Sequence, residues 1–262
     1  MRIALTIAGS DSGGGAGIQA DLKTFQRFGV FGTSAITAIT AQNTKGVNHW
    51  EAVSPDLVRA QIDSVAEDLP PAAFKSGMLA NAAIASVVAV GIREHSLPNY
   101  VLDPVMVATS GDVLFESDTI DVIRRELIPQ AFLVTPNLHE AAILVGHEID
   151  DEDAMARAAE TIVTDMGAQA VLIKGGHMAS GDRVVDILYD GNVRAFRGQR
   201  LATQNTHGTG CTLSAAITAQ LARGESLHAA VRRAILYVHN AIASAPGLGS
   251  GHGPLNHLAE DS

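Results

Sequence analysis

The chain has 262 residues, 47% of them hydrophobic, and its 18 basic against 28 acidic residues give a net charge of −10 at pH 7. That charge argues against a general attraction to nucleic acid or anionic membranes, and a single cysteine excludes an internal disulfide. The apolar run at residues 3–8 is too short for a signal peptide or membrane span, so we expect a cytoplasmic protein that binds small molecules.

Apolar segments of strand length alternate with segments of helix length along most of the chain. In chain order, the pattern predicts a strand at 3–8, a helix at 16–28, a strand at 33–41, a helix at 55–68, a strand at 73–76, a helix at 82–95, a strand at 100–103, a helix at 119–127, strands at 132–135 and 170–174, a hairpin at 184–196, and helices at 210–223 and 227–245. This alternation indicates an α/β fold with a mostly parallel sheet covered by helices on both faces. Since no linker separates two cores, we expect a single domain over residues 1–262.

Ligands of such sheets bind at the carboxyl ends of the strands. Polar or glycine-rich residues follow six predicted strands, at 9–17, 42–43, 77–78, 103–104, 137–140 and 174–177. Core packing does not account for all six, although each has a structural alternative.

The first of these segments, residues 9–17, contains five glycines, whereas a tight turn needs about two. Backbone contact with a ligand is therefore favoured over a turn alone. Residues 15–20 fit the relaxed G-x-G-x-x-A pattern of dinucleotide-binding folds, but no acidic residue ends the next predicted strand to hold a ribose. A Walker A loop is excluded because no glycine precedes a Lys-Ser or Lys-Thr pair.

Three charged residues end or follow predicted strands. Asp103 either approaches a metal-bridged phosphate or caps a turn, and the sequence favours neither role over the other. Glu140 stands three residues after Asn137, the spacing of a capping box, which explains it without a ligand. Lys174 is either an edge residue that reaches solvent or a point charge for a phosphate, and the second is favoured.

The only cysteine, Cys211, follows Gly208, Thr209 and Gly210 at the start of a predicted helix. Successive N–H groups at a helix N-terminus form an anion site. The same dipole predicts a pKa of the Cys211 thiol below its usual value of about 8.5. The alternative is a small buried thiol without chemistry.

Seven ordered motifs together resemble the bacterial hydroxymethylpyrimidine and phosphomethylpyrimidine kinases, a thiamine-synthesis family of the ribokinase superfamily. The resemblance runs from residue 3 to about 245, and the motifs lie at 8–24, 40–44, 75–78, 102–106, 135–141, 173–177 and 205–211. It implies a homodimeric three-layer ribokinase-like α/β fold. The implied reaction is phosphoryl transfer from ATP to 4-amino-5-hydroxymethyl-2-methylpyrimidine and then to its monophosphate.

The resemblance also implies roles for particular residues. It places Gly208, Thr209 and Gly210 at the anion hole with Cys211 as the candidate base, and Lys174 at the ATP phosphates. Mg²⁺ and its waters would be held by Asp103 and Glu140. Gln42 would read the aminopyrimidine, since a side-chain amide can accept from the exocyclic amine and donate to the ring nitrogen. The rest of the substrate pocket would be lined by Gly9, Asp21, Met78 and Val105.

The residues leave other functions open. Sugar kinases of the superfamily carry an aspartate where this chain has Cys211, but some pyridoxal kinases share the cysteine, so it does not identify the substrate. A pyridoxal kinase would differ in the alcohol that it phosphorylates. A non-catalytic module of the same fold would bind the pyrimidine without consuming ATP. A dehydrogenase would bind NAD, which the missing ribose acid argues against.

Overall fold

The computed structural model describes residues 1–106, 117–176, 178 and 182–260. Its main sheet has eight strands in the order β10-β9-β8-β7-β6-β5-β1-β2. The strands are β1 (Ile3–Ala8), β2 (Phe31–Ile36), β5 (Ala73–Ser76), β6 (Tyr100–Leu102), β7 (Leu133–Val134), β8 (Val171–Ile173), β9 (Arg183–Tyr189) and β10 (Val193–Gln199). The strands from β2 to β8 in this sheet are paired in parallel, and β9 and β10 form an antiparallel hairpin at its edge.

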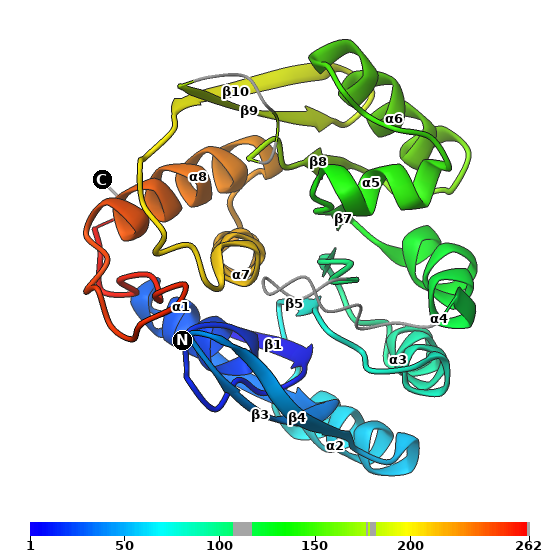
Figure 1. Ribbon diagram of the computed structural model, residues 1–262. Coiled ribbons are helices and arrows are strands. Elements are labelled where there is room, and N and C mark those ends of the chain that lie inside the picture. The colour runs from blue at the N-terminus through cyan, green and yellow to red at the C-terminus, as the bar shows by residue number, and fades with distance from the viewer. Residues whose placement is uncertain (107–116, 177, 179–181, 261–262) are drawn as a thin grey trace.

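Helices cover both faces of this sheet (Figure 1). One face carries α1 (Gly17–Arg27), α7 (Thr209–Ala222) and α8 (Leu227–Ala243). The other carries α2 (Pro55–Asp68), α3 (Ala82–Glu94), α4 (Ser117–Val122), α5 (Leu138–Val145) and α6 (Glu152–Thr164); α4 continues into a π-helical turn (Ile123–Leu127) and a 3₁₀ turn (Ile128–Gln130). Within the described ranges, no helix has the length and apolar character needed to cross a membrane.

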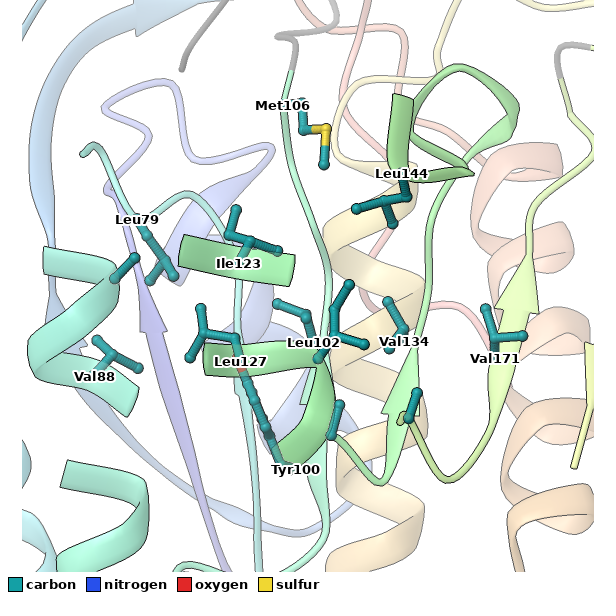
Figure 2. Close-up of a cluster of buried hydrophobic side chains, with 14 of the residues drawn as sticks. Leu79, Val88, Tyr100, Leu102, Met106, Ile123, Leu127, Val134, Leu144 and Val171 are labelled. Atoms are coloured by element: carbon teal, nitrogen blue, oxygen red, sulfur yellow. The ribbon is translucent and has the colours of Figure 1, made fainter. Parts of the chain in front are cut away.

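Each face of the sheet has its own hydrophobic core, because the parallel strands are apolar on both sides. Figure 2 shows part of the core under α3 and α5, where Leu102 of β6 and Val134 of β7 meet Leu127 and Leu144. Helix α7 is the central element of the opposite core, since all its residues from Thr212 to Ala222 are buried. A helix buried on every side is a rigid support for residues at its N-terminus.

The predicted mostly parallel sheet with helices on both faces is confirmed, and the strand at 3–8 and the helix at 55–68 have the predicted bounds. The predicted single strand at 33–41 is wrong. The chain leaves the main sheet at Thr37, whose N–H donates to Ala8 O and whose hydroxyl donates to Met78 O. The following strand, β3 (Ala38–Asn43), pairs with β4 (Gly46–Ala52) in a separate antiparallel hairpin.

The pattern predicts neither β4 nor helix α6. Strand β4 is mostly exposed, so it lacks the apolar run by which buried strands are recognised.

The capping box at Asn137 and Glu140 is present and starts α5. Of the predicted strand-end segments, the one at 174–177 includes His177, which lies outside the described residues.

Candidate active site

A cavity of about 840 Å³ opens where the parallel strands β1, β5 and β6 end, beside the N-terminus of α7. Its walls include Gly9 after β1, Met78 after β5 and Asp103 after β6. This is the edge at which α/β sheets bind ligands, and the volume suits a small-molecule site. The cavity is therefore the candidate active site.

The first turn of α7 forms one wall of the cavity, through Gly208, Thr209, Gly210 and Cys211. Gly208 caps the helix with φ +81°, and a Cβ there would lie 1.8 Å from Gly15 O. Only glycine fits this approach of two backbones. The Thr209 N–H donates to Thr206 O over 3.2 Å. The next N–H groups of the turn have no acceptor within the helix, so they are the ones available to an anion in the cavity.

An ion pair between the partly buried Lys174 and the buried Asp103 lies against this turn. Lys174 Nζ is 3.0 Å from Asp103 Oδ1, and Ser214 Oγ donates to Asp103 Oδ2 over 3.1 Å. A Cβ on Gly210 would lie 3.3 Å from Lys174 Nζ, so the ammonium stands at the helix N-terminus. Burial opposes the charge on Asp103, but Lys174 and Lys75 together hold the pKa of its carboxyl below the usual range. The structure thus places a cation and an anion where a phosphate would meet α7.

Glu140 makes the predicted capping box and also lines the cavity. Its Oε2 accepts from the Asn137 N–H over 2.8 Å, and its own N–H donates to Asn137 Oδ1 over 2.9 Å. Burial raises the pKa of the Glu140 carboxyl to about 7, and repulsion from Asp103 adds to this, although Lys174 opposes it. The helix cap and a role in the cavity are therefore compatible.

The two carboxylates fit a magnesium ion that is held jointly with phosphates. No cluster of three or more potential metal ligands occurs among the described residues. Mg²⁺ does not need one, because it typically keeps several waters and takes one or two carboxylates plus substrate phosphates. Asp103 and Glu140 repel each other across the cavity wall, and a divalent cation between them would relieve that repulsion.

The pKa of Cys211 differs from the prediction. Burial raises the pKa of its thiol to about 11, and the carboxylates of Asp21 and Asp103 add to this, against Lys75 and a hydrogen bond from the Gly17 backbone. The predicted lowering by the helix dipole is therefore wrong, because loss of water around the sulfur is the larger effect. The thiol is protonated at neutral pH in the protein without ligands.

Gln42 lies on β3, where hydrogen bonds hold its backbone while its side-chain amide makes no short hydrogen bond to the described residues. The Ser12 hydroxyl donates to Gln42 O over 2.7 Å and accepts from its N–H over 2.8 Å. Among the described residues, the amide makes only long contacts, 3.4 Å from Thr40 Oγ1 and 3.5 Å from His207 Nε2. An amide held in place without strong partners is available to a ligand. The cavity walls that it shares include the other predicted residues Gly9, Met78 and Val105.

Asp21 does not line the cavity, contrary to the resemblance. Its side chain is fully buried behind the wall, where Oδ1 accepts from Lys75 Nζ over 2.8 Å and Oδ2 from Thr6 Oγ1 over 2.6 Å. Burial opposes the charge on Lys75, but Asp21 and Asp103 raise its pKa above the usual value. Asp21 is therefore placed to neutralise Lys75 behind the cavity wall.

Sequence reasoning missed Asp11 and His207, which lie together in the cavity wall. The Asp11 carboxylate accepts from the N–H groups of Gly13, Gly15 and Ala16, and its Oδ2 is 2.8 Å from His207 Nε2. An aspartate two residues before a glycine run is the signal of such a turn. No local signal links it to a histidine 196 positions away.

The cavity also extends to the β9–β10 hairpin and α8, where apolar side chains line it beside polar ones such as Gln199 and His239. It is bounded by side chains of the β9–β10 hairpin and α8, namely Val184, Phe196, Ile235, Val238 and Ile242. Asp186 lies nearby, with its Oδ1 accepting from the Gly175 N–H over 2.8 Å. The cavity lining thus includes the β9–β10 hairpin and α8, the first turn of α7, and Gln42 of β3.

Comparisons with known proteins agree with this geometry. The family model described as phosphomethylpyrimidine kinase matches residues 11–256. A hydroxymethylpyrimidine/phosphomethylpyrimidine kinase of Rhizobium meliloti is 53% identical, over 98% of this chain and 97% of that protein. An ADP complex of Bacillus subtilis pyridoxal kinase superposes with a TM-score of 0.91 at 40% identity, covering 99% of this chain and 98% of the other. A phosphomethylpyrimidine kinase from Clostridium difficile gives a TM-score of 0.83 at 41% identity, covering 92% and 100%.

The Lys75–Asp21 pair generates a prediction about stability. Lys75→Met leaves a buried carboxylate without its cation, so we expect the free energy of unfolding at pH 7 to fall by about 3–5 kcal/mol. Urea denaturation followed by circular dichroism measures this loss. The double variant Lys75→Met/Asp21→Asn removes both charges and should lose less than the single variant. If Lys75→Met is as stable as the parent protein, the ion pair does not stabilise the fold.

Proposed function

The chain belongs to the phosphomethylpyrimidine kinase family, and from this premise we propose that it phosphorylates 4-amino-5-hydroxymethyl-2-methylpyrimidine and then the resulting monophosphate, with ATP as donor. This places it in thiamine biosynthesis. One observation carries the proposal: the Lys174–Asp103 pair and the first turn of α7 lie in the same cavity as the uncommitted amide of Gln42.

The cavity orders the reactants along one line. ATP takes the end lined by the β9–β10 hairpin and α8, with its base among Phe196, Val238 and Ile242 and its γ-phosphate at Gly208–Cys211. The aminopyrimidine takes the other end, where the Gln42 amide accepts from the exocyclic amine and donates to the adjacent ring nitrogen. Phosphoryl transfer depends mainly on such positioning and on charge stabilisation.

The transferred group meets fixed charges and dipoles. In the first reaction, the hydroxymethyl oxygen bonds to the γ-phosphorus, the bond to the β–γ bridging oxygen breaks, and ADP leaves. The N–H groups of the α7 turn face the equatorial oxygens, and Lys174 places its ammonium beside them. Asp103 and Glu140 would hold Mg²⁺, which neutralises phosphate charge when bound with ATP.

The two reactions differ in the need for a base. The alcohol must lose a proton, and the candidate acceptor is the thiolate form of Cys211 in the first turn of α7, which is a small fraction of the thiol at neutral pH. The monophosphate of the second reaction is already ionised at pH 7 and has no proton to lose. With its pKa near 11, the thiol stays uncharged and does not repel this dianion.

Pyridoxal kinase remains a second candidate, because a Bacillus subtilis pyridoxal kinase shares the fold at a TM-score of 0.91. The greater identity to the Rhizobium meliloti enzyme, 53% against 40%, favours the pyrimidine. The homodimer, the cytoplasmic location and the single domain remain predictions.

Product analysis tests the function directly. The protein is incubated with ATP, Mg²⁺ and the pyrimidine alcohol, and in parallel with pyridoxal, and the products are identified by mass spectrometry. We expect pyrimidine mono- and diphosphate, both abolished by excess EDTA and restored by added Mg²⁺. Turnover of pyridoxal alone would favour the second candidate, and binding without ATP consumption would indicate a non-catalytic module.

The role of Gln42 predicts a selective loss of pyrimidine binding. Gln42→Ala leaves the polar edge of a buried pyrimidine unpaired, which costs about 1–3 kcal/mol, so the pyrimidine KM should rise roughly 5- to 150-fold with the ATP KM unchanged. Asn48→Ala, on the exposed strand β4 of the same hairpin, is the matched control. An unchanged pyrimidine KM in Gln42→Ala would remove Gln42 from the site.

The role of Cys211 predicts a difference between the two reactions. Cys211→Ala should lower kcat/KM for the alcohol more than for the monophosphate, because only the alcohol needs a base. Between pH 7 and 9, below the thiol pKa of about 11, the thiolate fraction rises about tenfold per pH unit. First-step kcat/KM in the parent protein should rise with it, and Cys211→Ala should abolish the slope. Equal losses in both reactions, or an unchanged slope, would contradict this role.

A further inference from the structure

His207 lies where four distant segments of the chain meet. It is 6% exposed and stands in the loop before α7. Its backbone N–H donates to Gly253 O over 3.1 Å in the C-terminal segment, which runs back along α1 in Figure 1. Its ring approaches the glycine loop at Asp11 and the β3–β4 hairpin at Gln42. One side chain thus contacts both elements of the pyrimidine end from the loop that begins the anion hole.

The chemistry of these contacts determines which nitrogen of the His207 imidazole carries the proton. An ionised carboxylate only accepts hydrogen bonds, so His207 Nε2 carries the proton and donates it to Asp11 Oδ2 over 2.8 Å. The nitrogen then has no lone pair for the Gln42 amide 3.5 Å away. His207 therefore lies next to the Gln42 amide but accepts no hydrogen bond from it. The amide stays available to the substrate.

The packing around the ring leaves little freedom. A Cβ on Gly15 would lie 2.6 Å from His207 Cδ2 and 3.1 Å from Pro254 Cβ, so the ring is enclosed between the glycine loop and the C-terminal segment. Asp11 uses its remaining acceptor capacity on the backbone of that loop, at Gly13, Gly15 and Ala16. Movement of the imidazole would therefore move the glycine loop with it.

From this arrangement we propose that His207 is a positioning residue: its hydrogen bond to Asp11 locks the glycine loop and the Gln42 hairpin to the start of α7, so that the hydroxyl or phosphate of the bound pyrimidine faces the anion hole. Ser12 completes the connection, because it bonds both backbone groups of Gln42. The inference rests on the proposed function, and it assigns His207 no contact with the reacting atoms.

Three substitutions of His207 test the positioning role of its hydrogen bond to Asp11. His207→Leu removes the donor at similar volume, and His207→Asn ends at the position of Nδ1, too short to reach Asp11. Both should raise the pyrimidine KM and lower kcat, each about tenfold, because the acceptor is misplaced, with the ATP KM unchanged. His207→Gln places an N–H near the position of Nε2 and should recover most of the loss.

A second buried histidine is the matched control. His257 is 8% exposed and its Nε2 lies 3.2 Å from Thr212 Oγ1 of α7, away from Gln42. His257→Leu should lower the melting temperature and leave the ratio of the two KM values unchanged.

The outcomes separate this inference from the proposed function. If the parent protein forms no pyrimidine phosphate, the proposed function fails, whatever the variants do. If the parent is active and His207→Leu and His207→Asn keep the KM ratio of His257→Leu, the positioning role is overturned. It is also overturned if His207→Gln loses as much as His207→Leu, because the donor to Asp11 would then be irrelevant.

Discussion

The site depends on the pairing of charges that have been removed from water at the N-terminus of α7. Lys75 with Asp21 is a fully buried ion pair, and Lys174 with Asp103 is a pair in which the carboxylate is buried and the ammonium partly buried. Each ion would be costly alone, but each has a partner of opposite charge, and the carboxylates of Asp103 and Asp21 also accept hydrogen bonds from the hydroxyls of Ser214 and Thr6. The result is a charged wall that needs little rearrangement to meet a phosphate, which is the preorganisation that phosphoryl transfer requires.

The same charges explain the state of the cysteine. The helix dipole favours a thiolate at Cys211, but burial and two nearby carboxylates disfavour it more strongly. A fixed carboxylate at this position would repel a phosphate nucleophile by roughly 4 kcal/mol for two unit charges about 4 Å apart at an effective dielectric near 20. A neutral thiol avoids that cost. A site built this way tolerates both an alcohol and a phosphate ester as acceptor.

What the sequence could predict was local. Buried strands, helix N-termini and polar residues at strand ends have patterns of their own, and these located Gly9, Asp103, Lys174 and Cys211 correctly in one cavity. Contacts between distant segments have no such pattern. The turn of the chain at Thr37, the pairing of Asp11 with His207 and the burial of Asp21 behind the wall follow from tertiary packing. The predicted lowering of the Cys211 pKa is wrong for the same reason, because the sequence of a helix N-terminus does not show how deeply its side chains are buried.

The two ends of the cavity are built differently, and this bears on specificity. The part proposed to bind phosphates rests on β6, β8 and the buried helix α7, which lie at the centre of the fold. The end proposed to bind the pyrimidine is assembled from the glycine loop, the β3–β4 hairpin and the loop at His207, joined by a few side-chain hydrogen bonds. Loop substitutions can therefore change the acceptor without disturbing the transfer machinery. A pyridoxal kinase with a TM-score of 0.91 at 40% identity is what this division leads one to expect among the neighbours of the fold.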